Sequence, residues 1–189
     1  MAVDFPTLFS RNQIKTEDFG WSLMDVGVSS VMVASAMGNR LILGHKSTQK
    51  RIALFTDLKN VLVSNVLVLI AASIRFTLLT SIDYHDHVTE WGVHWNFFVT
   101  IAIVNFFLVF IRKPDYVLIL AILICFSMEL LISHYDIPNY IFFAPRTDFI
   151  SANKEGILSL PGYFILSLIG IWIGDNMYKT LIFDEPLHL

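Results

Sequence analysis

Five apolar segments, each close to twenty residues long, dominate the chain and restrict its fold more than any other feature. They cover about residues 21–43, 60–82, 94–111, 116–134 and 160–181. About 20 apolar residues are needed to cross the hydrocarbon core of a bilayer. Within lipid, only a helix satisfies the backbone hydrogen bonds of such a segment. The sequence therefore predicts an all-α, polytopic membrane protein with about five transmembrane helices in a single domain over residues 1–189.

Composition supports the same class and excludes others. Hydrophobic residues make up 55% of the chain, which leaves too little polar surface for a soluble domain of this size. The formal net charge of −3 argues against a protein that binds nucleic acid. The only cysteine, Cys125, lies within an apolar segment, so neither an intrachain disulfide nor a thiolate zinc cluster is expected.

The distribution of basic residues predicts the orientation of the helices. With five spans, eight basic residues fall on one side of the membrane: Arg40, Lys46, Lys50, Arg51, Lys59, Arg112, Lys113 and Lys179. Arg11, Lys15, Arg146 and Lys154 fall on the other. The positive-inside rule places the first group in the cytosol. The N-terminal segment, the loop around residues 83–96 and the loop around Asn153 then share the opposite, luminal face.

The loop between the second and third segments, which carries His85, His87, Glu90 and His94, is the most polar stretch beside the membrane. Three interpretations remain open. The histidines can bind a metal, although no cysteine supports this and we expect no metal site. One histidine can act as a general base that Glu90 or Asp86 orients. Alternatively, the loop is a solvated connector, and His94 caps the next helix.

Three further groups of polar residues are candidates for binding or catalysis. Asp25 lies early in the first segment, where it either reaches water or faces the bundle and holds polar substrate groups. Asn153-Lys154-Glu155 precedes the last segment, as a loop with an anchor or as a site in which Lys154 faces a phosphate. Asp4 and Lys15 look solvated by composition, but a carboxylate and an ammonium together can serve acyl transfer.

Three long stretches closely resemble the inositol acyltransferases of GPI-anchor biosynthesis, the PIG-W family. The first joins Ala2-Val3-Asp4-Phe5-Pro6 to Lys15-Thr16-Glu17-Asp18-Phe19-Gly20 and to residues 22–28. The second is His87-Val88-Thr89-Glu90-Trp91-Gly92-Val93-His94-Trp95-Asn96-Phe97-Phe98. The third is Ser151-Ala152-Asn153-Lys154-Glu155-Gly156-Ile157, followed by Leu160-Pro161-Gly162-Tyr163. Together they extend over essentially the whole chain, which resembles the central part of a longer enzyme.

The resemblance implies a multi-pass enzyme of the endoplasmic-reticulum membrane. It would transfer a fatty acyl group, typically palmitoyl, from acyl-CoA to the inositol of glucosaminyl-phosphatidylinositol, with acyl-CoA as co-substrate and no other cofactor. In that family the positions of Asp4 and Lys15 hold the proposed catalytic pair. We expect His94 to be the competing base, and we expect the substrates to contact Asp25, His87, Glu90, Asn96, Asn153, Lys154 and Glu155. The alternative is a non-catalytic membrane module that binds lipid or a partner protein supplying further helices.

Overall fold

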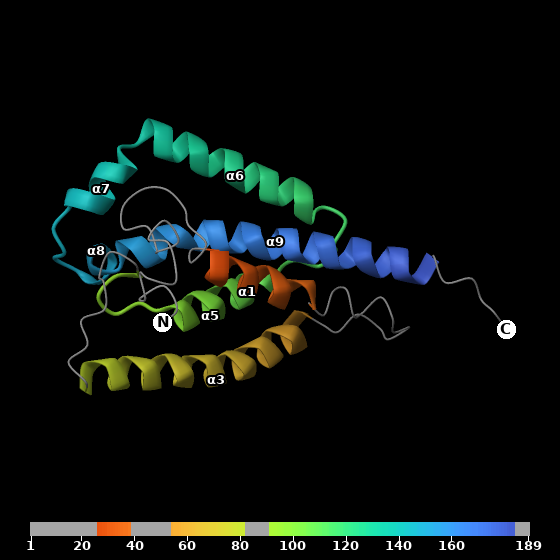
Figure 1. Cartoon of the computed structure of the whole chain (residues 1–189), viewed down its shortest axis with the longest axis horizontal. Helices are drawn as coiled ribbons and strands as arrows, with labels where there is room; N and C mark the ends of the chain where they lie inside the picture. The colour runs from red at the N-terminus through yellow and green to blue at the C-terminus, as the bar shows by residue number, and fades with distance from the viewer. Residues whose placement is uncertain (1–25, 39–53, 82–90, 184–189) are drawn as a thin grey trace, which may run out of the picture.

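A computed structural model describes residues 26–38, 54–81 and 91–183 of the chain. This part contains no strand and seven helices (Figure 1). They are α1 (Val26–Met37), α3 (Leu54–Ser81), α5 (Phe97–Leu108), α6 (Val117–His134), α7 (Ile137–Phe143), α8 (Phe149–Ala152) and α9 (Lys154–Phe183). The prediction of an all-α protein is confirmed for the described residues.

Helix α9 is the centre of the bundle. It packs against α1, α5 and α6, whereas α3 packs on α5 at the outer edge (Figure 1). Gly170 allows the close approach of α1, since a Cβ atom there would lie 2.6 Å from the carbonyl oxygen of Val33 and 2.8 Å from the Cβ of Ala36. The core fills the space between these helices with Met32, Ala36, Val104, Leu108, Ile111, Val117, Ala121, Leu168 and Ile171.

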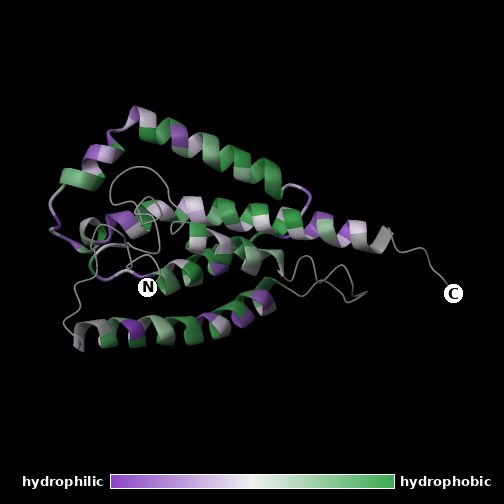
Figure 2. Ribbon diagram, viewed as in Figure 1, coloured by the Kyte–Doolittle hydropathy of each residue, from purple (hydrophilic) through white to green (hydrophobic). Residues whose placement is uncertain are grey.

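Three of the helices, α3, α6 and α9, are long and apolar enough to cross a membrane. Figure 2 shows apolar residues along most of α3 and α6, which form the two outer edges of the bundle. Helices α1 and α5 are also apolar, but each has 12 residues and is therefore only about 18 Å long. The described residues thus carry three candidate spans and two shorter apolar helices, and the five-span topology stays a prediction.

Helix α5 is shorter than the predicted segment 94–111 because of contacts at both of its ends. Asn96 caps its start, with Oδ1 accepting the backbone N–H of Val99 at 3.1 Å. Beyond Leu108 the chain leaves the helix while Val109 and Ile111 stay buried in the bundle. Arg112 then forms an ion pair with Asp57 in the first turn of α3.

Two asparagines join α3 to α5 by hydrogen bonds in opposite directions. Asn65 of α3 donates from Nδ2 to the carbonyl of Ala102 at 2.8 Å. Asn96 of α5 donates from Nδ2 to the carbonyl of Ala72 at 3.2 Å. Both alanines are buried, and their small side chains let the two backbones approach. The pair of asparagines therefore fixes how α3 lies along α5.

The interval between the fourth and fifth predicted segments is largely helical. It forms α7, α8 and the start of α9, which begins at Lys154 instead of near residue 160. Pro138 stands in the first turn of α7, where its missing N–H costs no hydrogen bond. Asp148 caps α8. Helix α3 also begins earlier than predicted, at Leu54 instead of near residue 60.

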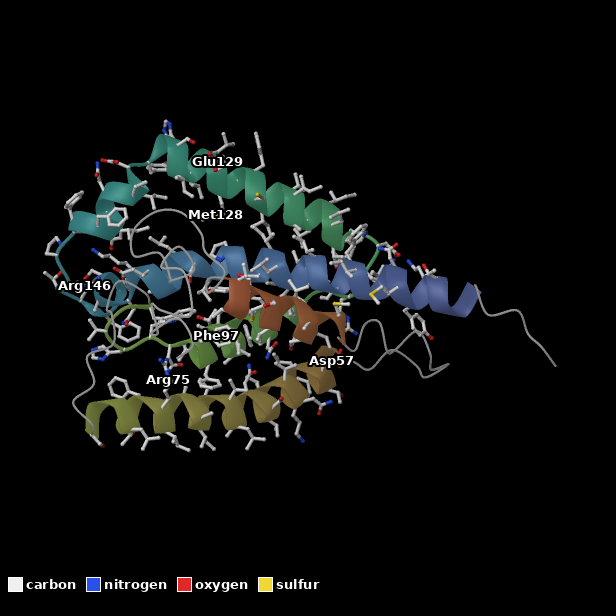
Figure 3. All side chains as sticks on the ribbon, viewed as in Figure 1. Asp57, Arg75, Phe97, Met128, Glu129 and Arg146 are labelled. Carbon is white, nitrogen blue, oxygen red and sulfur yellow. The ribbon has the colours of Figure 1, made fainter. Side chains whose placement is uncertain are left out.

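The described segments that connect the long helices lie at two opposite ends of the bundle. Residues 91–96, α7, α8 and the start of α9 form one end, and the turn after α5 with the start of α3 forms the other (Figure 1). Figure 3 shows Arg146 and Asp57 toward these opposite ends. The first end holds the described candidate residues and is called the motif end below.

Candidate functional site

Two segments far apart in sequence lie directly against each other at the motif end. The backbone N–H of Val93 donates to the carbonyl of Ala152 at 3.0 Å. The backbone N–H of His94 donates to Oδ1 of Asn153 at 2.7 Å. Residues 91–96 and 151–156 therefore form one unit, here called the docked unit.

Two glycines make this contact possible. Gly92 has a φ of +104°, and a Cβ atom there would lie 2.5 Å from Cα of Asn153 and 2.8 Å from the carbonyl oxygen of Ala152. Gly156 lies under the ring of Trp95, and a Cβ atom at Gly156 would collide with that ring and come within 2.7 Å of the Trp91 carbonyl oxygen. Neither position can accept a larger side chain without moving the backbone opposite it.

Aromatic side chains fix residues 91–96 to α5 and α9. The ring of Trp91 is buried and stacks on Tyr163 of α9, with centroids 5.8 Å apart and planes 20° from parallel. It also contacts the ring of Phe97 at the start of α5, with ring centroids 5.9 Å apart. Trp95 donates from Nε1 to the hydroxyl of Thr100 at 2.9 Å. The segment is thereby held between α5 and α9.

His94 combines a fixed backbone with an exposed side chain. Its amide is held by Asn153, whereas its imidazole is exposed and contacts Phe76 of α3 edge to face, with centroids 6.0 Å apart. The bond that holds the loop is thus made by the backbone of His94, and its imidazole is left accessible. Of the three predicted catalytic residues, His94 is the one that falls within the described part of the chain.

Asn153 is completely buried and its amide side chain is used within the protein. Besides accepting from His94, it donates from Nδ2 to the carbonyl of Phe149 at 2.8 Å. A buried amide that is satisfied on both sides holds backbone in place. The geometry therefore favours a positioning role for Asn153 over direct contact with a substrate.

Lys154 is only 2% exposed, and its ammonium faces the last turn of α7. Nζ donates to the carbonyls of Tyr140 at 3.0 Å and Ala144 at 2.6 Å, and it lies 5.4 Å from the centre of the Tyr140 ring. Basic side chains stabilise the carbonyl end of a helix in this way. These contacts favour an anchoring role for Lys154, whereas the phosphate contact proposed from sequence would need this ammonium to be reachable.

Glu155 forms a two-pronged ion pair with Arg146 from the connection between α7 and α8. Nη1 of Arg146 donates to Oε2 at 3.0 Å and Nη2 pairs with Oε1. Nη1 of the same arginine also donates to the carbonyl of Ala152 at 2.9 Å. Arginine suits this geometry because its donors form a planar fork. The ion pair links the connection between α7 and α8 to the first turn of α9.

Asp148 and Ser151 cap the short helix α8. Oδ1 of Asp148 accepts the backbone N–H of Ser151 at 2.8 Å, and the hydroxyl of Ser151 bonds the same oxygen. The hydrogen bond from the Ser151 side chain, followed by that from its backbone, lowers the pKa of Asp148 below its ordinary value of 3.8. The carboxylate is thus ionised at neutral pH, and its oxygen accepts the hydrogen bonds of the cap.

Five of the ten residues predicted for the site lie in the docked unit: His94, Asn96, Asn153, Lys154 and Glu155. The side chain of Asn96 caps α5 and bonds to α3. Asp4, Lys15, Asp25, His87 and Glu90 lie outside the described residues. Within the described ranges, no three histidine, cysteine or acidic side chains form a metal-binding group.

Sequence reasoning did not identify Gly92, Gly156 and Arg146 as residues of this unit. Both glycines lie inside the motifs quoted for the family resemblance, and that position was the one sign in the sequence that they belong to the site. Arg146 follows Pro145 in a stretch that read as a loop, and its partner Glu155 is nine residues away. No local pattern predicts that pair.

Comparison with known proteins gives a consistent result along the chain. The family model GWT1 matches residues 1–185. GPI-anchored wall transfer protein 1 of Schizosaccharomyces pombe is 38% identical over 191 residues, which cover 99% of this chain and 39% of that protein. The protein of the same name from Saccharomyces cerevisiae is 35% identical, over 98% of this chain and 38% of its own length. An uncharacterized protein of Arabidopsis thaliana is 36% identical, over 94% and 39%. The chain spans about two fifths of the length of these relatives.

Proposed function

Because the chain belongs to the GWT1 family, that of the GPI inositol acyltransferases, we propose that it carries central parts of a membrane-bound O-acyltransferase. The reaction proposed is transfer of a fatty acyl group, palmitoyl, from acyl-CoA to the inositol of glucosaminyl-phosphatidylinositol. The proposed location is the endoplasmic-reticulum membrane. The observation that carries the proposal is the family match over residues 1–185, which include all of the candidate site residues.

The chemistry needs a base and a group that stabilises negative charge. The base removes the proton of one inositol hydroxyl, and the oxygen attacks the thioester carbonyl of acyl-CoA. The tetrahedral intermediate then collapses, the C–S bond breaks, and the CoA thiolate leaves and takes up a proton. In this proposal Asp4 is the base and the ammonium of Lys15 faces the oxyanion. Partial desolvation of Asp4 would raise its proton affinity enough for the task.

The motif end offers a second assignment of the base. His94 has an exposed imidazole on a loop that Asn153 and Gly92 hold in place. Histidine is the side chain that most often serves as a general base. Asp4 and His94 are therefore competing candidates, and substitution separates them.

The test uses a chimera in which this chain replaces the matching segment of the Saccharomyces cerevisiae relative. Acylation of glucosaminyl-phosphatidylinositol is measured in microsomes from cells that lack their own inositol acyltransferase. Asp4→Ala and Lys15→Ala should each lower kcat by roughly 10²- to 10⁴-fold. His134→Ala, an exposed histidine at the end of α6, is the matched control and should leave kcat unchanged. Near-normal acylation by the Asp4 and Lys15 variants, with loss in His94→Ala, would transfer the role of base to His94.

The chain by itself distinguishes an enzyme from a binding module. Expressed alone in the same microsomes, an active chain yields acylated product from palmitoyl-CoA. Retention of glucosaminyl-phosphatidylinositol without turnover would instead support the non-catalytic membrane module. An inactive chimera with no retention of the lipid would contradict both.

A further inference from the structure

The connection between α6 and α9 exposes a group of large apolar side chains. They belong to Tyr135, Tyr140, Phe142, Phe143, Phe149 and Ile150, here called the α7–α8 face. Phe143 is 80% exposed, Phe149 63% and Ile150 60%. Such a concentration of exposed aromatic and aliphatic groups within sixteen residues marks an interaction surface.

This face is held in place by bonds to α9. Lys154 binds the carbonyls at the end of α7, and Arg146 binds Glu155 together with the carbonyl of Ala152. The carbonyl of Phe149 accepts from Asn153, the C-cap of α8, which directly precedes α9. The backbone of the segment is therefore fixed to α9 at the end of α7 and at Arg146.

The position of the face identifies what covers it. The segment joins the end of α6 to the start of α9, which lie at the same end of the bundle (Figure 1). Both helices are long and apolar enough to cross a membrane, and a segment that joins two spans lies where the bilayer begins. Its apolar groups continue those on the last turns of α6, where Leu130, Leu131 and Ile132 are exposed. An exposed apolar surface that continues a membrane-spanning helix meets lipid.

The composition of the segment agrees with a position at the boundary between lipid and water. Tyrosines are enriched at the level of the headgroups. The polar residues between the aromatic ones, among them Asp136, Asn139 and Thr147, are exposed and can reach water or headgroups. Segments of this kind lie in the plane of the interface, with the apolar groups about 5–10 Å into the boundary region.

We propose that the α7–α8 face is a membrane-contact surface that inserts Phe143 and Phe149 into the interfacial region of one leaflet. This inference does not depend on the proposed enzymatic activity. Its consequence concerns the docked unit, because Asn153 bonds both to Phe149 and to the amide of His94. Lipid contact at this face therefore sets the depth of residues 91–96 relative to the bilayer.

Site-directed spin labelling of the whole chain in lipid nanodiscs tests the proposal. The native Cys125 is exposed on α6 and is first removed as Cys125→Ser. Nitroxides are then attached to Phe143→Cys and Phe149→Cys, and their collision rates with oxygen and with a nickel chelate are measured. Phe126→Cys, exposed near the middle of α6, is the control in lipid. Thr147→Cys, exposed between α7 and α8, is the control in water.

The expected result is that both aromatic positions prefer oxygen over nickel, at a depth of about 5–10 Å below the phosphates. Their values should fall between those at the Phe126 and Thr147 positions. Nickel access equal to that at Thr147 would overturn the proposal, since the face would then lie in water. Low access of both oxygen and nickel would also overturn it, because protein would then cover the face. If access of the reagents rose when the protein was diluted with lipid, the covering protein would be a second copy of the chain. If one substitution lowers helix content, Ile150→Cys takes its place.

Discussion

Gly92 shows how much of the docked unit depends on a single residue. It combines a positive φ with a Cβ direction that runs into the backbone of Ala152 and Asn153. No other residue type satisfies both conditions, because a side chain adds strain at this φ as well as a collision. The contact between residues 91–96 and 151–156 therefore needs glycine at this position.

We predict that Gly92→Ala destabilises the protein by roughly 1–3 kcal/mol and weakens the His94–Asn153 contact. Unfolding in detergent micelles measures the loss of stability, and hydrogen exchange at the amide of His94 measures the loss of the contact. Gly162→Ala is the control, since a Cβ atom there meets nothing within 4 Å. That substitution should be neutral or stabilising, as alanine is the better helix former. Equal effects of the two variants would show that the geometry at Gly92 is not limiting.

The roles of individual residues were harder to predict than their positions. The motif patterns drew attention to His94, Asn153, Lys154 and Glu155, and the first two are in direct contact. A motif does not show whether a side chain can contact a substrate, because this depends on how far the packing of the helices buries that side chain. Asn153 and Lys154 are buried by partners 59 and up to 14 residues away, respectively. A single sequence gives no measure of such contacts.

Asn96 links two elements through one side chain, since its oxygen caps α5 and its nitrogen binds α3. We predict that Asn96→Ala loses about 0.5–2 kcal/mol for the cap and about a further 0.6 kcal/mol for the hydrogen bond between helices. Asn96→Ser keeps a hydroxyl that can cap and should lose only the smaller part. Reversible unfolding in mixed micelles gives both values. Asn176→Ala, which removes a bond within α9 alone, is the control. If serine and alanine cost the same, the cap contributes nothing.

The contact of α1 with α9 depends on the absence of a side chain at Gly170. We predict that Gly170→Leu pushes the two helices apart and destabilises the protein by about 1–3 kcal/mol or more. The same substitution at Gly162, where the helix surface is open, should have little effect. Thermal unfolding compares the pair, and an equally large loss at Gly162 would point to helix propensity instead of packing.

At the scale of elements, the sequence predicted apolar helices well and the short helices poorly. The long helices α3, α6 and α9 follow from runs of apolar residues, which are a local signal. Helix α7 was not predicted, since it has only seven residues and contains Pro138, although a proline in the first turn is compatible with a helix. Helix α5 ends at Leu108, and the chain beyond it pairs Arg112 with Asp57 on another helix. Such partners are set by the tertiary fold.

The whole molecule has two polar ends that differ in character. The motif end contains the docked unit and the α7–α8 face, and the other end contains Asp57 with the turn around Arg112 and Lys113. Distribution of basic residues over the chain predicts that the motif end is luminal. That orientation would place His94 on the same side as the predicted positions of Asp4 and Lys15, so the proposed base candidates would share one compartment.

The orientation can be measured with two single-cysteine variants in the Cys125→Ser background. Lys113 and Thr147 are both exposed. Lys113 belongs to the turn between α5 and α6 and Thr147 to the connection between α7 and α8, and these two segments lie at opposite ends of the bundle (Figure 1). In sealed microsomes, a membrane-impermeant maleimide should label Lys113→Cys at once and Thr147→Cys only after detergent opens the vesicles, because the positive-inside rule places Lys113 in the cytosol. Labelling of both after detergent controls for accessibility. The reverse order would place the motif end in the cytosol, and with it both the docked unit and the leaflet that the α7–α8 face contacts.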